Sequence, residues 1–228
     1  MSFSGQTYVE SPTYYQPLRE PTLNTSWVAH SSPPSLTPLS LFLAGGISNC
    51  PNWQATVRDR LQKSCPELVL FNPRRETYDT TSSDRDFVLA EQIKWEHVHL
   101  HLATAILFWF PSESVCPISL YELGTWSIMG PRQQTRVFLG THREYTRRRD
   151  IQLQLELANG SIHVHDDMDK SCRQVEDWYH NVMAERRRDV EAQQKGSTRF
   201  SFGFGILLNA ITRMTQMVKN NTVGQAIK

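Results

Sequence analysis

The sequence ATAILFWFPSESVCPISLYELG, residues 103–124, decides the fold of this chain. Its first eight residues, 103–110, form an apolar run of the length expected for one buried strand. A loop rich in proline and serine follows, and residues 118–129 then have the pattern of a helix, which a Gly-Pro pair ends. Glu122 therefore lies in the first turns of a helix that directly follows a buried strand.

The same alternation of apolar runs and amphipathic stretches continues on both sides of this segment. Short apolar runs predict strands over residues 39–46, 68–71, 103–110, 136–140 and 161–165. Helical spacing predicts helices over residues 51–63, 84–101, 118–129, 148–158 and 169–187. Short strands separated by helices need crossover connections, which favour parallel pairing. The sequence thus predicts a flavodoxin-like or Rossmann-like α/β three-layer sandwich with a five-stranded parallel sheet.

Composition divides the chain into three parts. Residues 1–38 are rich in serine, threonine, proline and tyrosine and poor in aliphatic side chains, so we expect a mostly disordered arm. Residues 39–187 contain the α/β pattern and form the predicted domain. Residues 188–228 form a C-terminal tail whose stretch 199–218 has the apolar spacing of an amphipathic helix. This stripe favours packing within the domain or against a sister subunit over contact with a membrane.

Charge and composition exclude several classes of function. Lysine and arginine number 24 and aspartate and glutamate 23, so no global field attracts a nucleic-acid polymer or an anionic membrane. The start of the chain lacks the pattern of a secretory signal, and no apolar stretch has the roughly 18 residues that span a bilayer. The four cysteines lack paired C-x-x-C spacing and are expected to be free thiols. We therefore expect a cytoplasmic protein.

Loops at one edge of the predicted sheet carry the candidate binding residues, because open parallel sheets bind ligands where the carboxyl ends of their strands meet. These candidates are Gly45, Gly46, Asn72, Arg74, Arg75, Ser112, Glu113, Cys116 and Ser119. A glycine pair permits close approach of a ligand or simply makes a tight turn. The arginines suit a phosphate group or lie in solvent. The serines and Glu113 suit sugar hydroxyls or cap the following helix.

Glu122 is the residue that most needs an explanation. A carboxylate near the start of a helix is stabilised by the helix dipole, which would make its role purely structural. Its neighbours Leu120, Tyr121 and Leu123 are apolar, however, and an ionised group among buried neighbours is costly. A functional carboxylate is the second interpretation.

Five segments resemble the nucleoside 2-deoxyribosyltransferase-like family: LFLAGGIS, PNWQ, FNPRR, QIKWEHVHLHLATAILFWFPSESVCPISLYELG and EYTRRRDIQLQLELA. The resemblance covers residues 39–177, and residues 92–124 are its most specific part. It implies an enzyme that cleaves the N-glycosidic bond of a small nucleoside or nucleotide, as an N-glycosidase or a deoxyribosyltransferase. It also implies a homo-oligomer that needs no cofactor.

The resemblance assigns roles to two glutamates. Glu122, in an E-x-G motif, corresponds to the nucleophile that attacks the anomeric carbon, a role in which a carboxylate splits one displacement into two easier ones. Glu96, 26 positions earlier, corresponds to the acid that holds or protonates the departing base, although a solvated helix position explains it equally well. The family's use of the first glycine loop brings Gly45 and Gly46 near the sugar.

Cys116 departs from the pattern of the family, whose best-studied members carry aspartate six positions before the nucleophile. A thiol does not replace a carboxylate at neutral pH unless its pKa is strongly moved. The alternative is therefore a catalytically inactive module of the same fold that binds a nucleotide or regulates a partner.

Histidine and arginine clusters suggest other functions only weakly. His97 and His101 lie four residues apart on the predicted helix 84–101, but an H-E-x-x-H motif is absent and no metal is expected. His163 and His165 lie at the end of a predicted strand, which explains them better than a metal site does. The arginine runs 147–149 and 186–188 open and end helices and are interpreted as solvated faces.

Overall fold

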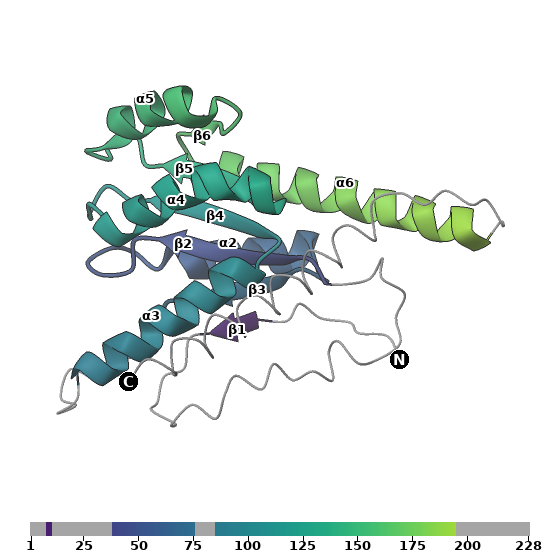
Figure 1. Cartoon of the computed structure of the whole chain (residues 1–228), viewed down its shortest axis with the longest axis horizontal. Coiled ribbons are helices and arrows are strands. Elements are labelled where there is room, and N and C mark those ends of the chain that lie inside the picture. Colours follow the sequence, from purple (N-terminus) through teal and green to yellow (C-terminus); the bar gives the residue numbers. More distant parts are fainter. Residues whose placement is uncertain (1–7, 11–37, 76–84, 195–228) are drawn as a thin grey trace, which may run out of the picture. The chain divides into compact units, whose positions relative to one another are not determined.

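A computed structural model describes residues 8–10, 38–75 and 85–194 (Figure 1). The strands are β1 (Tyr8–Glu10), β2 (Ser40–Gly45), β3 (Val69–Asn72), β4 (Ala105–Phe110), β5 (Arg136–Thr141) and β6 (Val164–His165). The helices are α2 (Trp53–Ser64), α3 (Arg85–Leu102), α4 (Pro117–Gln133), α5 (Arg148–Asn159) and α6 (Met168–Gln194). These strands form one parallel sheet in the order β1-β3-β2-β4-β5-β6.

The order of the strands reverses between β2 and β4. From β2 the chain crosses to β3 on one side, then returns past β2 to form β4 and continues outward to β5 and β6. β2 and β4 pair in parallel from Leu41 opposite Ala105 to Gly45 opposite Trp109. In open parallel sheets, ligands commonly bind at the carboxyl edge near such a reversal. The loops after Gly45 and Phe110 meet that edge.

Helices cover both faces of the sheet. Alternate strand residues such as Phe42, Ile106 and Phe108 form one buried cluster with residues of α3, α4 and α5. The opposite face carries Leu43, and Phe138 with its ring against Trp178 of α6. In Figure 1, α3 and α4 lie in front of the strands and α2 lies behind them. The predicted α/β three-layer sandwich is confirmed.

The sheet has one strand more than predicted. Tyr8–Glu10, inside the arm expected to be mostly disordered, pairs in parallel with β3 and extends the sheet at its edge. The free edge of β3 offers unpaired backbone groups, and such pairing needs no apolar sequence pattern. Residues 11–37 of the arm and the amphipathic stretch 199–218 lie outside the described residues.

Two helices run past their predicted ends. α4 continues through Gly130 and Pro131 because a proline in the last turn removes a single hydrogen bond. The helix ends at Gln134 instead, whose backbone is left-handed (φ 58°) and whose N–H bonds the carbonyls of Gly130 and Pro131. α6 extends to Gln194, seven residues beyond the predicted end at 187.

The chain divides into two compact units, residues 1–15 with 38–180 and residues 16–37 with 181–228. The candidate site lies wholly in the first unit. Among the described residues, none of the helices has both the length and the hydrophobicity needed to cross a membrane.

Arg60 of α2 forms an ion pair with Glu176 of α6, and this pair provides a test of how the two helices pack. Its Nε and Nη2 lie 2.9 and 2.8 Å from the two carboxylate oxygens of Glu176, and Ser64 also donates to Glu176. Arg60→Met keeps the apolar stem but leaves Glu176 without its cation, so urea denaturation should show a loss of about 1–3 kcal/mol. Arg147→Met, at an exposed i,i+3 pair, is the control and should cost below about 0.5 kcal/mol. Equal losses in both variants would contradict this role.

Candidate active site

Two glutamates predicted from sequence come together on the α3/α4 side of the sheet. Glu96 lies in α3 and Glu122 in α4, and both side chains are half-buried. Burial raises the pKa of Glu122 to about 8, and the negative charge of Glu96 contributes to this rise. The 26-residue separation therefore corresponds to two carboxylates within electrostatic reach of each other, and we call them the carboxylate pair.

The surroundings of Glu122 do not match a glutamate that supports the start of its helix. α4 begins at Pro117, so Glu122 is its sixth residue and lies beyond the first turn, where unpaired N–H groups stabilise an acid. Within the part of the chain that the structure describes, no hydrogen bond to the Glu122 carboxylate lowers its pKa. Glu122 is thus a poorly solvated carboxyl group that holds its proton at neutral pH.

Glu96 has more support for its charge than Glu122 has. Burial raises the pKa of Glu96, but a hydrogen bond from Gln92 and the positive charge of Arg75 oppose this rise. Nε2 of Gln92 lies 2.6 Å from Oε1 of Glu96. These contacts distinguish Glu96 from a solvated helix position. When the carboxylate pair holds one proton, Glu122 is therefore the favoured carrier and Glu96 the ionised member.

An aromatic cluster adjoins Glu96, and sequence reasoning did not identify it as part of the site. The Trp95 and His99 rings stack with centroids 4.0 Å apart, and His99 meets the Phe71 ring at 4.9 Å. Phe42 of β2 contacts Trp95 from the sheet side, at 6.2 Å between centroids. Burial lowers the pKa of His99, so this histidine is a neutral ring within an apolar wall. The sequence indicates this stacking only through the four-residue spacing of Trp95 and His99, which places them on the same side of a helix.

His97 and His101 also lie side by side, with ring centroids 4.3 Å apart, and His101 packs edge-on against Trp126. Over residues 8–10, 38–75 and 85–194, histidine, cysteine and acidic side chains form no group of three that could hold a metal ion.

The loop after β2 packs against the loop after β4. Gly45 has φ +151°, and a side chain there would meet the backbone of Trp109. A Cβ on Gly46 would lie 2.8 Å from Sγ of Cys116 and 2.8 Å from Cγ of Pro111. The Gly46 carbonyl accepts a hydrogen bond from the Trp53 indole at 2.8 Å. Contact between the protein's own loops therefore explains why both positions are glycine.

Cys116 is the buried residue that precedes α4. Its backbone is left-handed, with φ 51°, and its Sγ donates to the Ser114 carbonyl at 3.3 Å. Burial raises the pKa of the thiol further above neutrality. The group at this position is therefore uncharged, and it supplies neither a carboxylate acceptor nor a ready proton donor.

The guanidinium group of Arg74 is held by hydrogen bonds within the protein. Its guanidinium donates to the carbonyls of Pro51 and Cys50, both at 3.1 Å, and to Oε1 of Gln54 at 3.2 Å. Its backbone N–H donates to Oδ1 of Asn72, which is buried at the end of β3. These contacts tie the end of β3 to the loop before α2.

Three further candidate residues lie between the end of β4 and the first turn of α4. Ser112 and Glu113 bond each other at 3.1 Å on an exposed loop, and Ser119 is buried in the first turn of α4.

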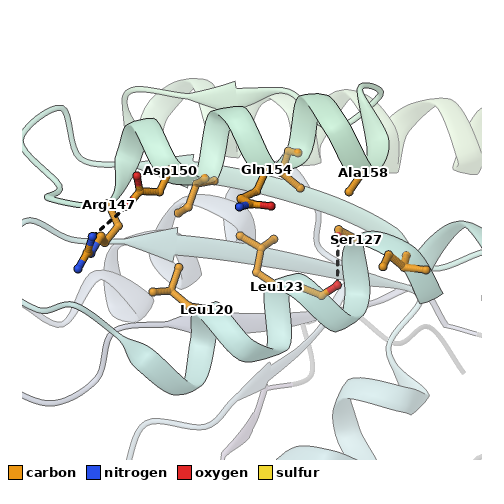
Figure 2. A pocket seen from close by; sticks show the side chains of 11 residues that line it. Leu120, Leu123, Ser127, Arg147, Asp150, Gln154 and Ala158 are labelled. Atoms are coloured by element: carbon orange, nitrogen blue, oxygen red, sulfur yellow. Dashed lines mark hydrogen bonds and ion pairs between the residues drawn. The ribbon is translucent and has the colours of Figure 1, made fainter.

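A groove of about 510 Å³ lies on the other flank of α4, between α4 and α5 (Figure 2). Its lining is mainly apolar, with Leu120, Leu123 and Ser127 from α4 facing residues such as Gln154 across the groove. Neither member of the carboxylate pair lines it. Glu122 lies about 100° around the helix from Leu123, which separates the groove from the acidic flank.

Residues 38–142 match the family model described as nucleoside 2-deoxyribosyltransferase like. This segment belongs to the nucleoside 2-deoxyribosyltransferase-like family. The matched segment runs from the residues before β2 to just past β5, and it contains both members of the carboxylate pair. The resemblance is thereby confirmed for this segment. A search of curated proteins finds no match.

The raised pKa of Glu122 predicts a pH-dependent stability of this nucleoside 2-deoxyribosyltransferase-like domain. Between the ordinary pKa of 4.5 and the folded value of about 8, unfolding ionises a group that the native state keeps protonated, so stability falls as pH rises. Glu122→Gln removes this loss. Chemical denaturation should give equal stabilities near pH 4, and at pH 8.5 a variant more stable by on the order of 1–3 kcal/mol.

Glu156→Gln, at an exposed position of α5, is the matched control and should show the pH dependence of the unmodified protein. Parallel stability curves for the protein and Glu122→Gln from pH 4 to 8.5 would contradict burial of the Glu122 carboxyl group.

Proposed function

We propose that this protein cleaves the N-glycosidic bond of a 2-deoxynucleoside or its monophosphate, with Glu122 as the nucleophile and Glu96 as the residue that handles the base. The carboxylate pair carries this proposal. Two half-buried acids on neighbouring helices, each with its pKa raised by burial, are costly to stability and characteristic of sites that perform acid–base chemistry. Family membership of residues 38–142 supports a nucleoside as the substrate class.

The proposed reaction needs one proton and one free carboxylate, which a pair holding a single proton supplies. The proton leaves Glu122 and reaches the base through Glu96, while an oxygen of Glu122 forms a bond to the anomeric carbon. The carbon–nitrogen bond breaks, and its electron pair stays with the base, which accepts the proton. Water, or a ring nitrogen of a second base, then loses a proton to the Glu96 carboxylate and attacks the anomeric carbon of the glycosyl ester, which breaks the ester bond and releases the Glu122 carboxylate. The first outcome is hydrolysis and the second is deoxyribosyl transfer.

We propose substrate-binding residues in the loops at the carboxyl edge of the sheet and in the first turn of α4. They are Gly45, Gly46, Asn72, Arg74, Ser112, Glu113, Cys116 and Ser119. Their contacts favour shaping the loops over binding charge, since Arg74 is engaged by backbone carbonyls. We further propose a cytoplasmic homo-oligomer whose partner is a small nucleoside or nucleotide and not a nucleic-acid polymer or a membrane. The near balance of acidic and basic residues supports this restriction.

The second candidate function is a catalytically inactive module of the same fold that binds a nucleotide or regulates a partner. Cys116 favours it, because its neutral thiol stands where the studied members of the family carry an aspartate. A thermal-shift screen separates the two candidates, since a binding module is stabilised by a nucleotide that it does not consume.

Base release by the full chain tests the catalytic proposal. Deoxynucleosides and their 5′-monophosphates are incubated with the protein, with and without an acceptor base, and products are separated by chromatography. Glu122→Gln should lower base release by about 10³-fold or more, since no carboxylate remains to form the ester. Quenched mixtures should contain a glycosylated peptide that includes Glu122. Unaltered turnover in Glu122→Gln, with Glu156→Gln as the control, would exclude Glu122 as the nucleophile.

The activity should also depend on pH in a defined direction. The active form of the carboxylate pair holds one proton. The pair loses this proton near pH 8, the pKa of Glu122. kcat/KM for base release should therefore fall as pH rises above about 8, and Glu96→Gln should alter this fall because it removes one member of the pair. A profile that stays flat to pH 9.5 would contradict a shared proton.

A further inference from the structure

Gln92 occupies a position in the site that the proposed function does not use. It lies in α3 one turn before Glu96 and is buried, with 6 % of its surface exposed. Its Oε1 accepts a hydrogen bond from Nε of Arg75 at 2.6 Å. Its Nε2 donates to Oε1 of Glu96 at 2.6 Å and to the Pro73 carbonyl at 3.0 Å. The amide thus connects the loop after β3 with one member of the carboxylate pair.

The partners of Gln92 permit one orientation of its amide group. Arg75 offers only donors, whereas the Pro73 carbonyl and an ionised Glu96 offer only acceptors. Turning the amide over would place its NH₂ against the guanidinium and its oxygen against two acceptors. The orientation shown satisfies both amide hydrogens, so Gln92 presents a fixed donor to Glu96.

The charged and titratable groups that face Glu96 come from two other elements. Among the described residues, Arg75 approaches from the loop after β3, and the charge of Glu96 acts on Glu122 of α4. On α3 itself, Lys94 is exposed and pairs with Glu91 at 3.0 Å. A fixed donor on the Arg75 side favours negative charge on Glu96, which leaves the proton of the pair to Glu122.

We propose that Gln92 is a positioning residue that orients the Glu96 carboxylate and, by linking it to Arg75, determines which member of the carboxylate pair carries the proton. This inference rests on the proposed function for its catalytic meaning, but the proton distribution can be measured without any turnover. A purely structural role for Gln92, as a bridge between α3 and the loop after β3, would change stability and leave the titration of Glu96 unaltered.

The test is a titration of the full chain carrying ¹³C-labelled glutamate carboxyl groups, followed by NMR, with Glu96→Gln and Glu122→Gln used to assign the two signals. Gln92→Glu keeps the shape of the side chain but, when ionised, has no N–H to donate to Glu96 and adds a like charge. Gln92→Leu removes all three hydrogen bonds. In both variants the Glu96 midpoint should move upward by about one pH unit.

Arg75→Gln provides a second route that leaves the buried amide in place, should the Gln92 variants fail to fold. It should also move the Glu96 midpoint upward, because it removes the cation at the far end of the link. Lys94→Gln is the matched control: it removes a cation two residues from Glu96 that is paired with Glu91, and it should leave the midpoint in place.

The outcomes separate this inference from the proposed function. An upward shift of the Glu96 midpoint, with the acid limb of kcat/KM moving to higher pH in parallel, supports both. The same shift in a protein that releases no base supports the role of Gln92 and overturns the proposed function. Unchanged midpoints in Gln92→Glu and Arg75→Gln, with folding shown by circular dichroism, would overturn the inference whatever the activity.

Discussion

The parallel pairing of β2 with β4 constrains the rest of the domain. Both strands are almost completely buried, so their backbone groups must find partners within the sheet, and each strand needs helices on two faces. Because crossovers between parallel strands are right-handed, the helices before and after β4 lie on the same face. This arrangement places α3 beside α4 and brings Glu96 within electrostatic reach of Glu122. The carboxylate pair is thus a consequence of sheet topology.

Burying two acids close together opposes folding, and the domain accommodates this cost unequally. Glu96 receives a hydrogen bond and a nearby cation, whereas burial and the negative charge of Glu96 both favour the protonated form of Glu122. An uneven environment of this kind separates the tasks of two like groups, because one stays ionised and the other stays neutral at the same pH. The rings of Trp95, His99 and Phe71 pack on one another and form an apolar wall beside Glu96.

The loops at the carboxyl edge are built mainly by contacts among themselves. Gly46 packs against Cys116, Arg74 binds the carbonyls before α2, and Tyr145 donates to the Val115 carbonyl at 2.7 Å. A thiol at position 116 fits this close packing because it is small and uncharged. An aspartate would need solvent or a donor at the same place, so packing and the departure from the family pattern have a common physical basis.

Local sequence determined the α/β class, the order of its elements and the location of Glu122, because buried strands and amphipathic helices leave periodic patterns that need no knowledge of partners. It missed β1, since pairing with a sheet edge depends on backbone groups whose availability only the fold decides. The hydrogen bond from Arg75 to Gln92 and the pKa values of the pair could not be predicted from the sequence either. Each of these depends on distance and burial between segments far apart in the chain, and tertiary packing alone sets those quantities.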